Sequence, residues 1–168
     1  GKNEYIILNV TFKLTKINHQ TKTDYGAIRD ELNKKGIKNP SIKEVSEAVI
    51  AIRQSKLPDP KDIGNSGSFF KNPVVSKKLF DKLQSKHKDV PSYVVSENEI
   101  KIPAGWLIEK CGFKGKRFGN TGVHEKQALV LVNYGKATGK EVLDLAKLIQ
   151  SKVKETFEID LEMEVNII

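Results

Sequence analysis

The sequence predicts an α+β domain in which a mostly antiparallel sheet carries helices packed on it. Stretches with the period-two pattern of strands lie near both ends of the chain, and amphipathic helical stretches lie between them. Strands and helices do not alternate regularly, which argues against a parallel sheet built from βαβ units. With 168 residues and 38% hydrophobic content, the chain is long enough for one core and short for two. We therefore expect a single domain over residues 1–168.

The first expected element is a strand over "YIILNVTFKL", residues 5–14. Its even-numbered positions are all apolar, from Ile6 to Leu14, whereas its odd-numbered positions are mixed. The strand begins almost at residue 1, and a Gly stands first in place of an initiator Met. We therefore expect the chain to be a fragment of a longer protein.

A weak helix is expected from about 24 to 35, ending at Gly36, and a stronger one follows over 41–56. The second helix opens with a capping box, because Ser41 is followed three residues later by Glu44. It ends before Pro58, since proline cannot continue a helix. The remaining expected elements are helices over 76–86, 103–112 and 138–157 and strands over 98–103, 126–133 and 157–168.

Composition narrows the classes of function. The net charge of +8 favours an anionic partner: nucleic acid, a phosphorylated small molecule or an anionic surface. One cysteine, Cys111, permits no intrachain disulfide, and three scattered histidines give no zinc constellation and no recognisable catalytic triad. No apolar run is long enough to span a membrane, and no signal peptide pattern is present at the start. We expect a soluble cytoplasmic protein without a metal site.

The stretch "GNSGSFFKNP", residues 64–73, is the strongest candidate for a functional loop. Its glycines permit backbone conformations that a Cβ forbids, and the Phe pair would anchor the loop in the core. It contains no Walker A or dinucleotide-binding glycine pattern. Lys56, Lys71 and Asn72 are candidates to bind a diphosphate, two as cations and one through its amide. Arg53 lies near Lys56 in the sequence and is a weaker candidate.

Three collinear blocks carry a family resemblance. They are "RQSKLPDPKDIGNSGSFFKNPVVS", "IPAGWLIEKCGFKGKRFGNTGVHEKQALVLVN" and the closing "LEMEVNII". Together they resemble the C-terminal substrate-binding domain of UDP-N-acetylenolpyruvoylglucosamine reductases, in the class that carries an extra tyrosine-bearing loop. The resemblance implies that the FAD-binding domains precede this chain and are absent from it. It also implies that NADPH reduces the FAD, which then passes hydride to the enolpyruvyl group of the UDP-N-acetylglucosamine substrate to give UDP-N-acetylmuramate.

The same resemblance implies roles for single residues. Ser68 matches the proton-donating serine, and Glu164 matches the glutamate thought to stabilise the enolate together with an arginine from the absent part. Lys56, Asn72 and Gln127 match residues that hold the UDP diphosphate. The chain has "LEMEV" where "LEPEV" is commoner in the family. As a fragment, the chain alone is expected to bind no flavin and to be inactive.

Two other classes of function stay open. A basic nucleic-acid-binding α+β domain would explain the charge. However, the lysines are spread over helix faces, and no strand interleaves basic and aromatic residues as a single-strand binding surface would. A purely structural module is the third reading, and it leaves Ser68, Lys56 and Asn72 without a reason.

Overall fold

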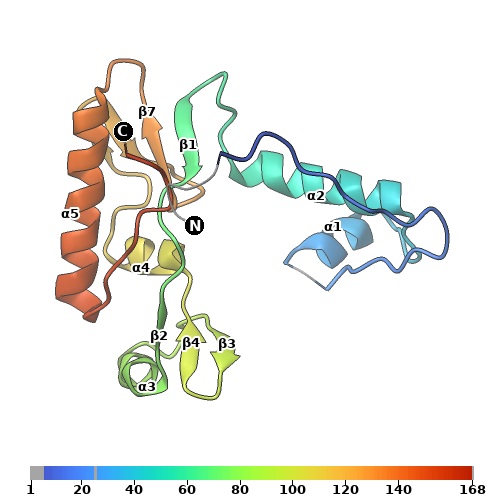
Figure 1. Ribbon diagram of the computed structural model, residues 1–168, viewed down its shortest axis with the longest axis horizontal. Coiled ribbons are helices and arrows are strands. Elements are labelled where there is room, and N and C mark those ends of the chain that lie inside the picture. The colour runs from blue at the N-terminus through green and yellow to red at the C-terminus, as the bar shows by residue number, and fades with distance from the viewer. Residues whose placement is uncertain (1–5, 25, 168) are drawn as a thin grey trace. The chain divides into compact units, whose positions relative to one another are not determined.

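The computed structural model describes residues 6–24 and 26–167, and Figure 1 shows the arrangement of their helices and strands. Contacts divide the chain into two compact units, residues 1–53 and 54–168, and each is described by itself. The helices and antiparallel sheets confirm the α+β class. Among the helices of the described residues, none is both long and apolar enough to cross a membrane.

The first unit is a helical pair with a small core. α1 spans Ile28–Lys34, and α2 spans Ile42–Lys56, so that its last three residues fall in the second unit. The predicted capping box is present at the start of α2: the Ser41 amide donates to the Glu44 carboxylate at 2.7 Å, and the Glu44 amide donates to the Ser41 hydroxyl at 3.3 Å. The core of the pair consists of Ile28, Leu32 and Ala48, with Ile37, Val45, Val49 and Ile52 packed against it.

The predicted strand over 5–14 is wrong for the part that the structure describes. Residues 6–15 lie in no helix or strand, and Tyr5 falls outside the described residues. The alternating pattern is that of a strand, but a strand exists only when a neighbouring strand supplies hydrogen-bond partners. No backbone hydrogen bond joins residues 6–14 to any described residue.

The second unit holds two antiparallel sheets. The larger has the strand order β1 (Gly64–Ser68), β7 (Val130–Asn133), β6 (Thr121–Val123), β5 (Arg117–Phe118). The smaller has the order β2 (Val74–Ser76), β4 (Glu99–Lys101), β3 (Tyr93–Ser96). α5 (Gly139–Phe157) lies along one face of the larger sheet, and α3 (Lys77–Lys86) packs on β2 and β4 (Figure 1). The short α4 (Ala104–Lys110) packs against α5.

One core joins these elements. Its most deeply buried large side chains include Phe70, Ile102, Leu107, Ile108 and Ile149. α5 begins at the predicted capping box, where the Thr138 hydroxyl and the Glu141 carboxylate exchange hydrogen bonds with each other's backbone amides. Trp106 packs against this core beside His87 and Phe157, as expected of a packing residue.

The closing stretch follows the predicted alternation only in part. Ile159 and Leu161 are buried, and Met163 and Val165 pack against the core. Instead of a full strand, the stretch forms a single bridge between Met163 and Phe70. It nevertheless brings the C-terminal candidate residues beside the stretch that follows β1.

Candidate functional site

The glycine-rich stretch 64–68 is an edge strand rather than a loop. It pairs with β7 through Gly64, Asn65 and Ser68, and the register slips between the last two, which is the signature of a β-bulge. Gly67 has φ +71°, a left-handed conformation that favours glycine. The Asn65 side chain accepts from the Gly67 amide and donates to the Ile63 carbonyl, both at 3.0 Å. The bulge ends the regular pairing at Ser68.

Ser68 is exposed at the end of β1, and buried aromatic residues hold it in place. Phe69 and Phe70 are 3% and 1% exposed, and their ring centroids lie 5.3 Å apart. The Phe69 amide donates to the Leu129 carbonyl at 2.8 Å. No described residue hydrogen-bonds to the Ser68 hydroxyl. An anchored backbone thus presents a hydroxyl group that is available to a ligand.

The C-terminal stretch places Glu164 on the chain segment next to Ser68. The Glu164 amide donates to the carbonyl of Phe69 at 2.9 Å, and the Lys71 amide donates to the carbonyl of Glu162 at 2.9 Å. The Glu164 side chain is exposed and makes no ion pair with the described residues. The pairing therefore brings together two predicted catalytic residues that are 96 positions apart in the sequence.

Lys71, one of the three candidates for a diphosphate site, forms an ion pair within the second unit. Its ammonium group forms an ion pair with Glu162 at 2.5 Å, so its charge is already matched inside the protein. Both side chains are at least half exposed, so the pair leaves Lys71 accessible to a ligand. The ion pair joins the same two residues as the hydrogen bond from the Lys71 amide to the Glu162 carbonyl. It therefore strengthens the pairing of the two chain segments, one of which contains Glu164.

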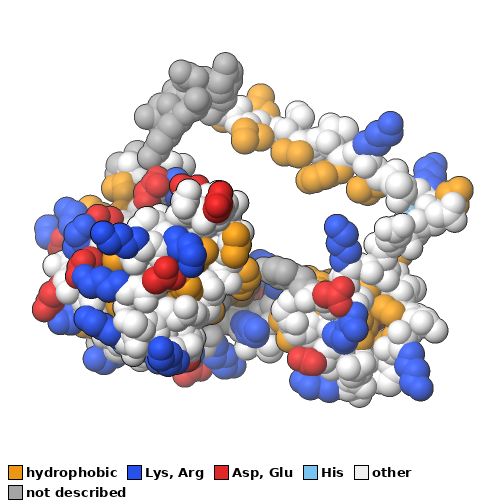
Figure 2. All heavy atoms as spheres, turned by 90° about the horizontal axis from the view of Figure 1, so that it is seen from below, with side chains coloured by type: hydrophobic (Ala, Val, Ile, Leu, Met, Phe, Trp, Pro, Cys, Tyr) orange, Lys and Arg blue, Asp and Glu red, His pale blue; other side chains and the backbone are white. Residues whose placement is uncertain are grey.

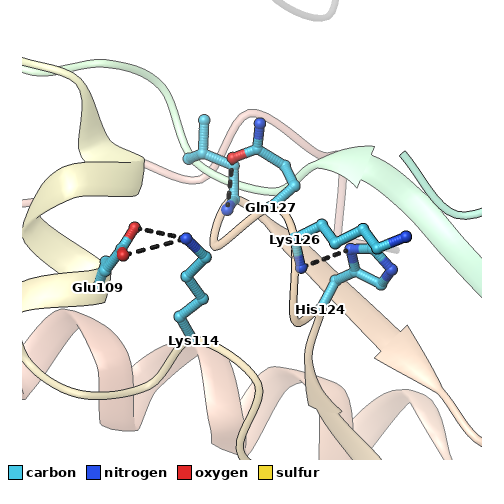
Figure 3. A network of polar contacts seen from close by, with 6 residues as sticks. Glu109, Lys114, His124, Lys126 and Gln127 are labelled. Atoms are coloured by element: carbon cyan, nitrogen blue, oxygen red, sulfur yellow. Dashed lines mark hydrogen bonds and ion pairs between the residues drawn. The ribbon is translucent and has the colours of Figure 1, made fainter. Parts of the chain in front are cut away.

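Asn72 and Gln127 each lie beside the first turn of α4. The Asn72 Oδ1 accepts from the backbone amide of Ala104 at 2.9 Å. The Gln127 Oε1 accepts from the backbone amide of Leu129 at 3.4 Å, and a Cβ on Gly105 would lie 3.4 Å from the same oxygen. In Figure 3 the Gln127 side chain turns its oxygen toward this backbone amide and its nitrogen away from it. Both carbonyl oxygens are therefore occupied, and both NH₂ groups remain as donors.

Two polar contacts beside Gln127 set the local charge (Figure 3). Lys114 donates to both carboxylate oxygens of Glu109, at 3.0 and 2.9 Å, so the negative charge of Glu109 balances the positive charge of Lys114. The His124 Nδ1 accepts from the Lys126 amide at 3.3 Å, and burial lowers the pKa of His124, which favours the neutral ring. Lys126 itself is exposed and has no carboxylate partner among the described residues. Lys126 was not among the candidates predicted from the sequence, although it immediately precedes the candidate Gln127.

The two remaining candidates lie on α2. Lys56 is its last residue and is exposed, and no hydrogen bond or ion pair joins it to another described residue. Arg53 is exposed and belongs to the first unit. The geometry thus groups Ser68, Glu164, Asn72 and Gln127 within the second unit, and it gives no contact that includes Lys56 or Arg53.

Other candidate chemistries find little support in the described part of the chain. It contains no group of three or more His, Cys, Asp or Glu side chains placed to hold a metal ion. Burial raises the pKa of Cys111, whose Sγ lies 3.8 Å from the Thr156 hydroxyl, so the thiol is not activated. On the face seen in Figure 2, acidic side chains are interspersed among the basic ones. Pairs such as Lys77–Asp81 and Lys140–Asp144 match part of the positive charge, which disfavours a continuous surface for nucleic acid.

The second unit is thus an antiparallel α+β domain that holds four candidate polar side chains, Ser68, Asn72, Gln127 and Glu164, at exposed or half-buried positions. The family model for the C-terminal domain of UDP-N-acetylenolpyruvoylglucosamine reductase matches residues 59–168. The chain belongs to this family.

Individual relatives extend the match to nearly the whole chain. A UDP-N-acetylenolpyruvoylglucosamine reductase of Flavobacterium johnsoniae is 59% identical over 167 residues, which cover 99% of this chain and 50% of the relative. One of Pseudomonas fluorescens is 47% identical, over 96% of this chain and 48% of the relative. The chain thus spans about half the length of these relatives. A crystal structure of UDP-N-acetylenolpyruvylglucosamine reductase from Thermus caldophilus has a TM-score of 0.44 and 24% identity, covering 74% of this chain and 33% of that one.

Proposed function

We propose that this chain is the substrate-binding part of an enzyme that reduces UDP-N-acetylglucosamine enolpyruvate to UDP-N-acetylmuramate, a peptidoglycan precursor. Family membership and the shared name of the relatives support this reaction. The observation that carries the proposal is the pair of oriented amides, Asn72 and Gln127. The Ser68 hydroxyl and the Glu164 carboxylate lie in the same unit as these two amides.

The two amides suit a diphosphate. Their carbonyl oxygens accept from backbone amides, so any ligand meets NH₂ groups, which donate to phosphate oxygens. An acceptor-only ligand such as a diphosphate satisfies these donors without rearranging the site. Lys56 is the proposed cation of this subsite, because its long side chain is exposed and unpaired within the described residues.

Ser68 and Glu164 serve the reacting end of the substrate. Addition of hydride to C3 of the enolpyruvyl group leaves negative charge at C2, which spreads into the carboxylate. Ser68 then donates the proton to C2, since a carbanion-like carbon is basic enough to accept it from a positioned hydroxyl. Glu164 in its acid form donates a hydrogen bond to the enolate, and an arginine supplied from outside this chain contributes the positive charge. The free Ser68 hydroxyl and the exposed Glu164 carboxylate support these roles.

We expect FAD and NADPH to supply the hydride and to be bound by the half of the protein that this chain does not span. A hollow of about 240 Å³ lies between α5 and the β5–β6 hairpin, but it does not suit FAD. Glu141 and Asp144 line it, and their carboxylates would repel a dinucleotide diphosphate. We therefore predict that the purified chain is colourless and has no reductase activity by itself.

A two-dimensional amide NMR titration with UDP-N-acetylglucosamine tests the proposal. We expect shifts of the side-chain NH₂ signals of Asn72 and Gln127 and of the backbone amides around Ser68. The side-chain NH₂ of Asn133 is an internal control, because it donates to the Ala137 carbonyl at the other end of β7. Absence of shifts at millimolar ligand, or equal shifts of Asn133, would contradict the proposed site. A salt-sensitive response to any oligonucleotide would instead favour nucleic-acid binding.

A further inference from the structure

Two carboxylates of the closing stretch lie on the same side of the chain. Glu162 and Glu164 are two residues apart, and both side chains are exposed. The residue between them, Met163, forms the bridge with Phe70 and packs against the core. Because successive side chains of an extended segment point to opposite sides, both carboxylates point away from the core. Glu164 has a role in the proposed reaction, whereas Glu162 has none so far.

Lys71 lies opposite Glu162 and diagonal to Glu164. The Lys71 amide donates to the Glu162 carbonyl, and two residues further along the closing stretch the Glu164 amide donates to the Phe69 carbonyl. Cβ atoms of directly opposite residues lie about 4.5–5.5 Å apart, and those of diagonal neighbours lie about 7–8 Å apart, which a long side chain can span. The ammonium group of Lys71 can therefore reach either carboxylate.

In the folded chain Lys71 pairs with the directly opposite carboxylate. Its Nζ lies 2.5 Å from the Glu162 Oε1, and Glu164 forms no ion pair with the described residues. The side chains of Lys71 and Glu162 are 50% and 62% exposed, and an ion pair this exposed contributes little to stability. Its larger effect is to determine which of the two carboxylates has the lysine as its neighbour.

We propose that Glu162 is a positioning residue that holds the ammonium group of Lys71 away from Glu164. The inference rests on the proposed function for the role of Glu164, which donates a hydrogen bond to the enolate in its acid form. A cation within about 4–6 Å of a carboxyl group favours the ionised form, which has no proton to donate. By pairing with Lys71 at the opposite position, Glu162 leaves Glu164 available in the form that the reaction needs.

An ion pair that only joined two chain segments would behave differently. Its loss would have the same effect whichever partner was removed. Under the proposal the two partners differ: Glu162→Gln releases Lys71 toward Glu164, whereas Lys71→Met leaves no cation to release. The harm done by Glu162→Gln should therefore disappear when Lys71 is removed as well.

NMR of this chain tests the contact without ligand and without activity. The ¹³C signal of the Glu164 carboxyl group is compared at one fixed pH. Lys71→Met should leave this signal in place in the parent, but should move it when Glu162 is already Gln. Lys154→Met is the matched control, because Lys154 pairs with Asp160 in the same stretch, and it should move the signal in neither background. If Lys71→Met moves the signal equally in both backgrounds, or in neither, the proposal is wrong.

Kinetics then test the consequence, with this chain joined to the first half of the Flavobacterium johnsoniae relative. Glu162→Gln should lower kcat about fivefold and leave KM for the UDP-sugar substrate within about twofold, and adding Lys71→Met should restore kcat to within about twofold of the parent. An equal loss in the double variant would overturn the proposal. So would a lower KM with unchanged kcat, which would identify the released Lys71 as a ligand of the diphosphate. If the parent hybrid has no reductase activity, the proposed function fails, and the NMR comparison still decides whether Glu162 holds Lys71.

Discussion

Exchanging Asn72 for aspartate separates ligand recognition from helix capping. In Asn72→Asp one carboxylate oxygen can still accept from the Ala104 amide, which Oδ1 does at 2.9 Å in the parent protein. The NH₂ donor, however, is replaced by a negatively charged oxygen. The substitution therefore keeps the local fold and inverts the hydrogen-bonding character that a ligand meets.

The expected loss of affinity follows from two effects. A hydrogen bond to a charged group contributes about 1.5–3 kcal/mol. Two like charges about 4 Å apart near a protein surface repel by about 1–4 kcal/mol. The smaller values sum to about 2.5 kcal/mol, and since each 1.4 kcal/mol is about tenfold, the affinity for a UDP-sugar should fall by about 50-fold or more.

Isothermal titration with UDP-N-acetylglucosamine measures this change in a full-length hybrid, in which the first half of the Flavobacterium johnsoniae relative is joined to this chain. Thermal unfolding of the same samples checks the fold. Asn133→Asp is the matched control, because Asn133 accepts from the Gly135 and Ala137 amides away from the proposed site. It should leave the affinity unchanged. If Asn72→Asp binds as tightly as the parent, or if its affinity falls only in proportion to a lost fold, the reasoning about the oriented amides is refuted.

Three further outcomes follow from single residues. Ser68→Ala should lower the turnover of the hybrid by about 10²–10⁴-fold while the affinity for UDP-N-acetylglucosamine stays within about threefold, and equal turnover would remove the serine from proton transfer. Gly67→Ala should lower the free energy of unfolding by about 1–2 kcal/mol in denaturant titration, since φ is +71° there although no atom lies within 4 Å of the added Cβ. Hydrogen bonds from the Thr138 backbone and side chain lower the pKa of Glu141, so this carboxylate contributes stability above its ordinary pKa that is lost as pH falls through the lowered value. Thr138→Ala removes the N-cap hydroxyl and should destabilise the chain by about 1 kcal/mol at pH 7. It should reduce this acid dependence only in part, because the backbone amide that contributes most to it remains, and parallel pH curves for parent and variant would contradict the prediction.

The sequence predicted the helices best, because their signals are local. Capping boxes at Ser41 and Thr138 marked two helix starts that the structure confirms. The short strands β3, β5 and β6 were not predicted, since two to four residues give too little periodicity. β1 was taken for a loop because glycines in "GNSGS" weaken any strand preference, yet β7 supplies the hydrogen bonds that make it one. For 6–14 the periodicity was strong and the partner strand was missing.

The contacts within the candidate site could not be predicted from local sequence patterns. Neither the Lys71–Glu162 ion pair nor the bond between Glu164 and Phe69 can be read from spacing, since each joins residues more than 90 positions apart. The resemblance named Ser68, Asn72, Gln127 and Glu164 as a group. The orientation of the two amides depends on backbone donors of α4 and of the turn before β7, which only the folded chain provides.

The fixed orientation of Asn72 and Gln127 also has a consequence for inhibitor chemistry. Amides whose oxygens are already engaged cannot flip to suit a new ligand without losing a backbone hydrogen bond. If the two NH₂ groups bind the diphosphate as proposed, compounds that present neutral acceptors to them, such as sulfone or carbonyl oxygens, should replace it without its charge. Compounds that present NH or OH donors at the same position should be rejected, however well their shape fits.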